Sequence, residues 1–498
     1  MNVNPITRLD YPDPDVIRVE DTYYMVSTTM HFMPGCEILQ SFDLVHWEHV
    51  TYVYETLDHT DAQQLKSGHN IYGQGMWAAS LRYHEGRFCI CFVANDTRKT
   101  YLYTSEKIDG PWKKQLIEGF YHDGSLLFDE DGRNYIVYGN DEIWITELNE
   151  DLTAPKKDGL HRLLVSDHKN PELGYEGSHI QKINGYYYIF LVHSLRDRWM
   201  RTEACFYSDS LEGEFTGGDV LCDDRGYCGQ GVAQGGIVDT PDGKWYAMLF
   251  QDSGAVGRIP ILLPVTWKDH FPFFGQNGHV PEEIEVHSTR PGYIYQPLVG
   301  SDDFCNGLLP RWQFNHDPDP RYYHLDALQG TYTITTREVC TELTQAVNTL
   351  TQRMSYPSCA AEVTVDASAL KEGDVAGLCA LQGCYAAVGI TKHHGKYEVL
   401  MLDKKEDGIL DMTEGTVVES HQMDFRLEAD FCNMKDEARC YYRVNKGDWL
   451  PIGTVHKLYF KLDHFTGCRF GLFCYAAEET GGSACFRDFK YYDVDEIS

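Results

Sequence analysis

WAASLRYHEG, from Trp77 to Gly86, is one copy of a pattern that recurs through the first half of the chain. Each copy starts with a distinctive side chain and small residues, crosses an apolar stretch and ends in a tight polar turn. The opening segment DPDVIRVED, from Asp13 to Asp21, fits the pattern with one residue deleted. The remaining copies are DGSLLFDEDG from Asp123 to Gly132, EGSHIQKING from Glu176 to Gly185 and QGGIVDTPDG from Gln234 to Gly243.

An aromatic or apolar run follows each turn, as in RFCICFVA, RNYIVYGN and KWYAMLFQ. Aromatic and β-branched residues favour strands, so each copy predicts two strands joined by a short turn. The turns recur about every 50 residues, a spacing typical of four-stranded propeller blades. The five copies therefore predict a five-bladed β-propeller around a central channel, with the first residue of each copy near the axis.

The first residue of each copy is the most informative position. It is a carboxylate in Asp13, Asp123 and Glu176, and it is Trp77 or Gln234 in the other copies. A single acidic residue before glycine or proline usually serves a turn. Three acids at one repeat position instead favour a functional site, because neighbouring like charges repel and are kept mainly where they do chemistry.

The repeat ends between Pro291 and Ser301, and a different strand pattern follows. Runs such as GTYTITT, AAEVTVDAS and RFGLFCYA have strand composition, frequent turns and few helix signals. This pattern predicts an antiparallel β-sandwich. We therefore expect an all-β chain, with the propeller at residues 1–295 and the sandwich at residues 301–498.

Composition excludes several classes of partner. The net charge of −32 argues against nucleic acid and anionic membrane surfaces, which require clustered lysine and arginine. The chain has no apolar stretch long enough for a membrane span, and its first residues, MNVNPITRLDYPDPD, lack the pattern of a secretory signal. The 16 cysteines are scattered, often in apolar runs, and are expected to be reduced. We therefore expect a cytoplasmic protein.

A ring of acids with an aromatic side chain suits the cleavage of a glycosidic bond. One carboxylic acid protonates the leaving oxygen, and a second, ionised carboxylate activates water or attacks directly. The two roles need different protonation states at one pH, and a third carboxylate can raise the pKa of the acid and orient it. Trp77 could stack on a sugar face, and Arg258 could bind sugar hydroxyls or hold a carboxylate's charge.

These segments resemble the family 43 glycoside hydrolases. The first 300 residues carry the resemblance in YPDPDVIRV, MWAAS, YHDGSLLFDEDG, GYEGSHIQK and the GR of GAVGRIPILLPV. The family's catalytic domains are five-bladed propellers that act on xylose and arabinose linkages. The C-terminal part, from SDDFCNGLLPRWQFNHDPD to RFGLFCYAAEETGGSACFRDFKYYD, resembles the concanavalin-like sandwich appended to the family's β-xylosidases.

The resemblance implies a role for each acid. Asp13 is expected to be the general base, Asp123 the residue that orients the acid and modulates its pKa, and Glu176 the general acid. The family inverts the anomeric centre, which requires about 6.5–9.5 Å between base and acid. The expected substrate-binding residues are Met30, His31, Trp77, Gln234 and Arg258.

Gln234 departs from the family's commonest pattern. Many members have histidine at this position, near a water or calcium site in the channel. Glutamine can bind water or sugar but is a poorer metal ligand, so neither a metal ion nor another cofactor is predicted.

The expected function is exo-acting release of xylose from the non-reducing end of short β-1,4-xylo-oligosaccharides. The alternative is an α-L-arabinofuranosidase or a bifunctional enzyme, because the same acids serve both sugars. Less favoured are a non-catalytic sugar-binding propeller, which would have lost a carboxylate, and an endo-acting arabinanase. The appended sandwich favours xylose, and we expect its loop from Ala476 to Ala484 to approach the propeller mouth. The expected partner is a small oligosaccharide, and an oligomer is left open.

Overall fold

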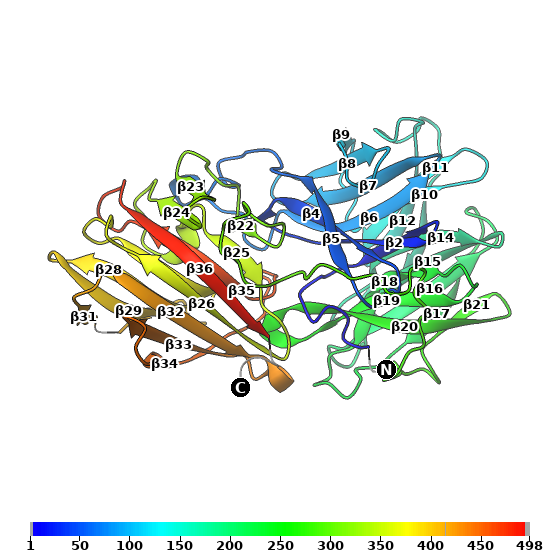
Figure 1. Cartoon of the computed structure of the whole chain (residues 1–498). Coiled ribbons are helices and arrows are strands. Elements are labelled where there is room, and N and C mark those ends of the chain that lie inside the picture. Colours follow the sequence, from blue (N-terminus) through cyan, green and yellow to red (C-terminus); the bar gives the residue numbers. More distant parts are fainter. Residues whose placement is uncertain (1–2, 414, 494–498) are drawn as a thin grey trace.

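The computed structural model describes residues 3–413 and 415–493, which form two β-rich domains (Figure 1). Among these residues the helices are single 3-10 turns, and none is long and apolar enough to span a membrane. The turns are η1 (Lys66–Gly68), η2 (Gly254–Val256), η3 (Leu343–Gln345) and η4 (Cys432–Met434).

The first domain is a propeller of five four-stranded antiparallel blades within the described residues. Each blade is made of strands in chain order, with β3 left out of the first blade, and the first strand of each blade is innermost. The first blade has β1 (Asp15–Val19), β2 (Thr22–Ser27), β4 (Gly35–Ser41) and β5 (Glu48–Tyr54); the second has β6 (Met76–His84), β7 (Arg87–Ala94), β8 (Lys99–Ser105) and β9 (Lys113–Ile117). The third has β10 (Ser125–Phe128), β11 (Asn134–Asn140), β12 (Glu142–Leu148) and β13 (His161–Ser166); the fourth has β14 (Glu176–Ile183), β15 (Tyr186–Ser194), β16 (Arg201–Ser208) and β17 (Thr216–Leu221); the fifth has β18 (Val232–Asp239), β19 (Trp245–Asp252), β20 (Arg258–Lys268) and β21 (Phe271–Phe274).

The inner strands close into a ring. β1, β6, β10, β14 and β18 each contact the next, and β18 contacts β1. The aromatic runs that follow the turns fill the spaces between blades, because alternate residues of a strand point to opposite faces. Tyr23, Tyr101, Tyr135 and Tyr188 are buried in four such inter-blade clusters.

Side chains on the inner strands also bond to the backbone of the next blade. In three successive pairs of blades, a polar side chain accepts the amide N–H of a residue on the next inner strand. These bonds identify equivalent positions in the blades independently of the sequence pattern. The pairs are Leu81 N to Asp15 Oδ2 (2.7 Å), Leu126 N to Ser80 Oγ (3.1 Å) and Ile180 N to Ser125 Oγ (3.1 Å).

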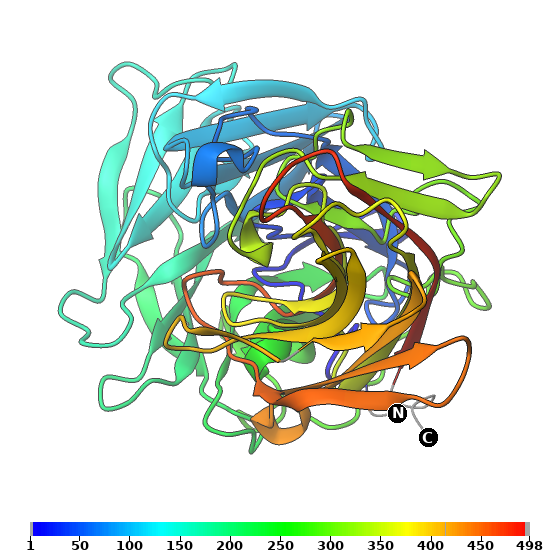
Figure 2. The same cartoon turned by 90° about the vertical axis from the view of Figure 1, so that its left-hand side faces the viewer.

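The second domain is a sandwich of two antiparallel sheets. Figure 2, viewed from the sandwich side, shows it in front of the ring of blades. One sheet has β22 (Gln313–Asn315), β25 (Leu350–Arg353), β35 (Arg469–Tyr475), β27 (Val375–Leu381), β28 (Ala386–His393), β29 (Lys396–Lys404), β30 (Leu410–Met412) and β31 (Thr416–Val418). The other has β23 (Tyr323–Asp326), β24 (Thr331–Thr335), β36 (Ser483–Asp493), β26 (Ser358–Asp366), β32 (Gln422–Asp430), β33 (Glu437–Val444) and β34 (Leu450–Lys457).

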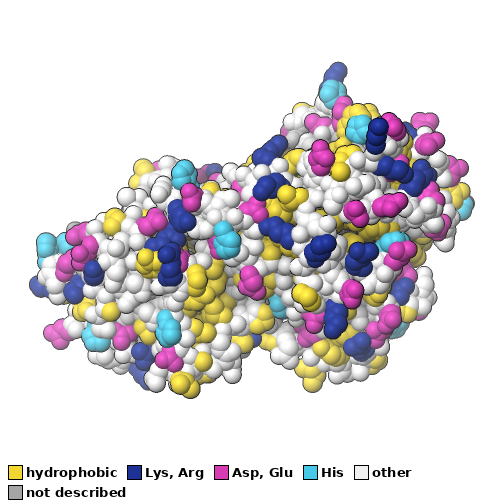
Figure 3. All heavy atoms as spheres, turned by 90° about the horizontal axis from the view of Figure 1, so that it is seen from above, with side chains coloured by type: hydrophobic (Ala, Val, Ile, Leu, Met, Phe, Trp, Pro, Cys, Tyr) yellow, Lys and Arg dark blue, Asp and Glu magenta, His cyan; other side chains and the backbone are white. Residues whose placement is uncertain are grey.

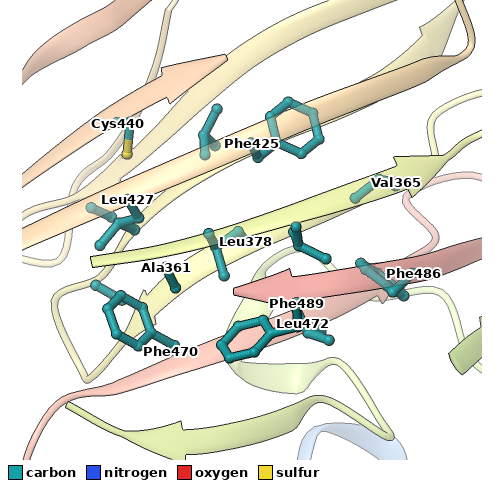
Figure 4. Close-up of a cluster of buried hydrophobic side chains, with 14 of the residues drawn as sticks. Ala361, Val365, Leu378, Phe425, Leu427, Cys440, Phe470, Leu472, Phe486 and Phe489 are labelled. Carbon is teal, nitrogen blue, oxygen red and sulfur yellow. The ribbon is translucent and has the colours of Figure 1, made fainter. Parts of the chain in front are cut away.

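The sandwich core lies between the two sheets. Along β32, buried residues alternate with more exposed ones, as expected for a strand with one face on the core. Figure 4 shows Phe425 and Leu427 of this strand with Leu378, Phe470 and Phe486 in the same cluster. Burial of these large apolar side chains stabilises the domain at roughly 1.5–3 kcal/mol each.

The two domains are joined by an interface with both polar and apolar contacts. The propeller strand β3 (Phe32–Met33) pairs with β22, so one sheet of the sandwich extends into the propeller domain. Arg353 forms an ion pair with Glu37 across the interface at 2.8 Å. Asp10 accepts the amide N–H of Gly467, which brings a sandwich loop to the propeller. The sandwich can therefore contribute side chains to a site at the propeller mouth.

Acidic and basic side chains are interspersed over the face of the molecule shown in Figure 3. On this face neither sign of charge is gathered in one large patch.

Candidate active site

The residues predicted to face the axis lie where the inner strands begin. Asp13, Asp123 and Gln234 have positive backbone φ angles of 52°, 47° and 63°. Such angles are uncommon outside glycine and persist where the surrounding structure enforces them, often at functional sites. The pairing register also shifts at the start of β6, β14 and β18. Bulges of this kind redirect side chains beside active sites.

The prediction that all five starting residues share one position is wrong by one residue in two blades. In the second and fourth blades the positive φ belongs to Ala78 (26°) and Gly177 (65°). The inter-blade hydrogen bonds give the same register. Trp77 and Glu176 therefore precede the position that Asp13 occupies.

Turn length explains the error. The turn between the first two strands has two residues in the first, second and fourth blades but five in the third and fifth. Aligning the copies on the last residue of each pattern, which lies in the turn, therefore shifts these two groups of blades by one residue relative to each other. The same shift accounts for the residue apparently deleted from the opening copy. All five side chains still lie at the same end of the ring.

Asp13 is held in one orientation at the base of the mouth. It is 6% exposed, and both carboxylate oxygens accept hydrogen bonds. Thr28 Oγ1 donates to Oδ2 at 2.6 Å, and Arg258 Nη1 donates to Oδ1 at 3.1 Å. The structure therefore brings Arg258 to a carboxylate, one of the two roles that the sequence suggested for it, and adds Thr28.

Asp123 and Glu176 lie on either side of a histidine. His122 Nε2 is 3.5 Å from Asp123 Oδ2 and 3.5 Å from Glu176 Oε2. Asp123 also accepts the amide N–H of Gly177 at 3.0 Å, while Asn140 Nδ2 donates to Glu176 Oε2 at 2.8 Å. The backbone next to Glu176 is thus bonded to Asp123, which suits a residue that orients the acid.

Burial and charge shift the pKa values of this group. Burial raises the pKa of Asp123 to about 6, and the charges of Glu176 and Asp13 act in the same direction against the opposing effect of His122. The neighbouring charge of Asp123 raises the pKa of His122 to about 9, in spite of burial and with the help of Glu176. His122 is therefore a cation at neutral pH.

His122 is a site residue that the repeat pattern did not predict, although it lies in the motif YHDGSLLFDEDG. In the corrected register it occupies the repeat position of Trp77 and Glu176. One ligand atom from each of His122, Asp123 and Glu176 lies within 4.8 Å of the others, a spacing that could suit a cation. A protonated imidazole has no free lone pair, so His122 could serve as a metal ligand only after it loses its proton.

An aromatic wall borders the acids, and one member comes from the sandwich. Phe465 lies in the segment between β34 and β35, and its ring centroid is 5.5 Å from that of Trp77. The guanidinium of Arg258 lies 4.2 Å from the centroid of the Phe465 ring and donates to the Phe465 carbonyl at 3.4 Å. The sandwich therefore covers one side of the mouth.

The segment expected to do this, from Ala476 to Ala484, lies elsewhere. The resemblance to the β-xylosidase sandwich suggested a closing loop here, but the backbone of this segment bonds to Cys340, Thr336 and Lys371 of the sandwich. This expectation is wrong. Phe465 is distant in sequence from the repeat and lies in no pattern that would have indicated it.

Met30 and His31 lie in the wall between the domains. Met30 is 2% exposed and forms a bridge with Met76, the residue before Trp77. His31 is fully buried, with its ring 4.8 Å from that of His316 and 4.7 Å from that of Tyr72. Their contact with substrate stays a prediction.

Gln234 is positioned by an acid that the sequence analysis also missed. Its amide N–H donates to Glu203 Oε2 at 2.7 Å, and its side chain lies against Gly177. Glu203 is fully buried, and burial raises its pKa well above the usual value. Nearby Arg201 forms an ion pair with Asp252. In the sequence, Glu203, Arg201 and Asp252 stand out only as charged residues within otherwise largely apolar predicted strands.

The family model for glycosyl hydrolases family 43 matches residues 3–272, and that for the beta xylosidase C-terminal concanavalin A-like domain matches residues 301–492. The chain belongs to glycosyl hydrolase family 43. The resemblance found in the sequence and the expected fold class, a five-bladed propeller followed by a concanavalin-like sandwich, are therefore confirmed.

Individual relatives match along nearly the whole chain. Over 99% of its length, the chain is 26% identical to a beta-xylosidase of Formosa agariphila, of which 89% is covered. The structure of a bifunctional GH43-CE protein of Bacteroides eggerthii matches with a TM-score of 0.92 and 42% identity; the match covers 100% of this chain but 64% of that protein. A second solved structure matches with a TM-score of 0.86 and 27% identity over 99% of both chains. It is that of a GH43 glycoside hydrolase engineered to display both endo-xylanase and exo-arabinofuranosidase activity.

Proposed function

We propose that this family 43 hydrolase removes single xylose residues from the non-reducing end of short β-1,4-xylo-oligosaccharides. The observation that carries the proposal is the contact between Phe465 of the sandwich and Trp77 of the propeller, beside the three carboxylates. A wall formed by two domains closes one side of the mouth. Such closure favours a pocket for a terminal sugar over an open groove for a polymer.

The proposed reaction is a single displacement with inversion. Asp13 takes a proton from water, and the water oxygen bonds to the anomeric carbon from one side. Glu176 gives its proton to the glycosidic oxygen as the bond to the departing sugar breaks on the other side. The hydrogen bonds from Thr28 and Arg258 hold Asp13 in place for the first transfer.

Asp123 and His122 complete the proposed mechanism as positioning residues. Asp123 holds the amide next to Glu176, and His122 lies between the two acids. After the reaction Asp13 carries a proton and Glu176 is ionised, so the site must exchange one proton with solvent before the next cycle. Glu176 retains 20% exposure of its side chain, which gives it a route to solvent.

The choice of sugar is the finer part of the proposal. The sandwich matches the β-xylosidase C-terminal model, and a whole-length relative is named beta-xylosidase. The alternative is α-L-arabinofuranosidase activity, alone or together with xylosidase activity, which the name of the engineered relative supports.

One comparison tests both parts. We expect higher kcat/KM on nitrophenyl β-xylopyranoside than on nitrophenyl α-L-arabinofuranoside, and release of xylose as the α anomer from xylobiose. The reverse order would favour the arabinofuranosidase, and oligosaccharide ladders from longer chains would contradict exo action. An unchanged anomeric configuration in the first product would contradict inversion.

We also propose that the enzyme works in the cytoplasm on short oligosaccharides. All 16 cysteines are free in the structure, as expected for a reducing compartment. Fractionation of cells of the native host tests this, and recovery of the activity outside the cytoplasmic fraction would contradict it.

A further inference from the structure

Trp199 is a large aromatic side chain left exposed at the propeller mouth. It is 43% exposed, and it lies in the loop between β15 and β16. The backbone of this loop is closed by a hydrogen bond from Leu195 N to Met200 O at 3.1 Å. Trp199 has no part in the proposed mechanism. An exposed indole has an apolar face with no role in the core of the blade.

The strand pairing places this loop above Glu176. Glu176 pairs with Val192 in β15, and Val192 in turn pairs with Glu203 in β16. Beyond them, the last residues of β15 pair with the first residues of β16, and the Trp199 loop joins these ends. The loop therefore leaves the fourth blade at the end where Glu176 lies.

The ring of Trp199 packs against the guanidinium group of Arg201. The guanidinium carbon of Arg201 lies 5.1 Å from the Trp199 ring centroid and 5.2 Å from that of Phe250. Arg201 is held by its ion pair with Asp252. A cation over an indole face stabilises the position of the ring. Burial and the charge of Arg258 lower the pKa of Arg201 to about 10, which leaves it charged at neutral pH.

Phe250 and Arg258 connect Trp199 with the aromatic wall formed by Trp77 and Phe465. Arg258 lies 5.4 Å from the centroid of Phe250, and it also contacts Phe465, which packs on Trp77. Aromatic rings and two arginines thus continue around the mouth from Trp77 to Trp199.

We propose that Trp199 is the platform for the departing sugar, the first unit on the reducing-end side of the bond that is cut. This inference rests on the proposed function. Glu176 protonates the departing oxygen, so the departing sugar lies on the side of Glu176, and Trp199 extends from the same blade. A neutral sugar presents C–H groups that pack on an indole face, and its hydroxyls stay in water at the partly exposed ring.

The test compares substrates with and without a departing sugar. Trp199→Ala and Trp199→Phe are assayed on xylobiose and on β-xylosyl fluoride, whose departing group is fluoride. The ratio of kcat/KM on xylobiose to kcat/KM on the fluoride is expected to fall about tenfold in Trp199→Ala, and much less in Trp199→Phe, which keeps an aromatic face. Tyr83→Ala is the matched control, because Tyr83 is similarly exposed (45%) near the opposite end of an inner strand.

Two results would overturn the inference. An unchanged ratio in Trp199→Ala would show that the indole does not contact the departing sugar. An equal change in Tyr83→Ala would show a general effect of surface aromatic loss. If the wild type prefers arabinosides, the corresponding arabinoside and arabinosyl fluoride replace the xylosides. Failure of the wild type to cleave any of these substrates would instead contradict the proposed function.

Discussion

The imidazole of His122 lies 3.5 Å from a carboxylate oxygen of Glu176, with the carboxylate of Asp123 equally close on Nε2. A cation in this place stabilises the ionised form of Asp123, because opposite charges within about 4–6 Å favour ionisation. The His122 cation therefore opposes the rise in the pKa of Asp123 that burial causes.

Replacing His122 with asparagine is expected to move the acidic limb of the pH profile upward. The wild-type pKa of Asp123 is about 6 with the His122 cation beside it, so loss of the cation raises that pKa further. Activity on nitrophenyl β-xylopyranoside, measured from pH 4 to 9, should decline at a higher pH in the variant. A downward shift of that limb would contradict this electrostatic role.

Replacing Glu176 with alanine is expected to affect substrates unequally. Natural disaccharides need protonation of the departing oxygen, and their kcat should fall by about 10²–10⁴-fold. Aryl glycosides with good leaving groups need little protonation and should lose much less. Glu85→Ala is a suitable control, because that carboxylate is 78% exposed at a blade turn.

Asp13→Ala is the matching test of the base. Both classes of substrate need an activated water, so both should lose nearly all activity. Equal losses in Glu176→Ala, or a marked difference between substrates in Asp13→Ala, would show that the two roles are wrongly assigned.

The propeller could be predicted because its signals are local. Turn residues and aromatic strands recur within each blade, and the acids lie beside them. The position of Glu176 relative to Asp123 was one residue in error, because the turn has two residues in the fourth blade and five in the third while the glycine is kept in both. The equivalence of His122, Trp77 and Glu176 became visible only from the hydrogen bonds between blades.

The part of the site contributed by the sandwich could not be predicted in detail. Phe465 reaches Trp77 through packing of two domains, and nothing in its own segment repeats elsewhere. The resemblance indicated that the sandwich helps to close the mouth, but it led to the wrong segment. The role of buried charges such as Glu203 could not be predicted for the same reason, because their partners are distant in sequence.

Asp123→Asn is expected to stabilise the protein at neutral pH while it reduces activity. The pKa of Asp123 rises from its ordinary 3.8 to about 6 on folding, so the native state binds more protons than the unfolded state between these values. Stability therefore decreases as pH rises through this range. An uncharged asparagine avoids this cost but also removes the charge that stabilises the His122 cation, so the net gain is at most about 1–3 kcal/mol at pH 7.

Urea unfolding at pH 7 and at pH 4 measures this effect. The gain in the free energy of unfolding should be present at pH 7 and shrink toward pH 4, where the wild-type carboxyl is neutral in the folded state. A gain of equal size at both pH values would exclude the charge of Asp123 as its cause.

Phe465→Ala is expected to open the mouth. The substitution removes the ring that packs on Trp77 and covers Arg258, so kcat/KM on xylobiose should fall about tenfold or more. Leu462→Ala is the matched control in the same segment, because Leu462 is 72% exposed. Retention of full activity in Phe465→Ala would contradict a role for the sandwich in the site.

The buried histidines beside that segment are expected to weaken the domain interface in acid. His464 stacks on Tyr72 with ring centroids 3.9 Å apart, and burial lowers the pKa of His464 to about 4. Burial also lowers the pKa values of His31 and His316 well below the usual 6.5. The unfolded chain binds protons at these residues before the native state does. The free energy of unfolding should therefore fall as pH drops from about 6.5 toward 4.

His464→Phe separates this contribution from other acid effects. Phenylalanine can retain the stacking on Tyr72 but cannot take up a proton, so the decline in stability between pH 6.5 and pH 4 should be shallower in the variant. Unfolding by urea at several pH values in this range provides the measurement. An equally steep decline in the variant would mean that His464 titrates alike in the folded and unfolded chains, contrary to its burial against the propeller.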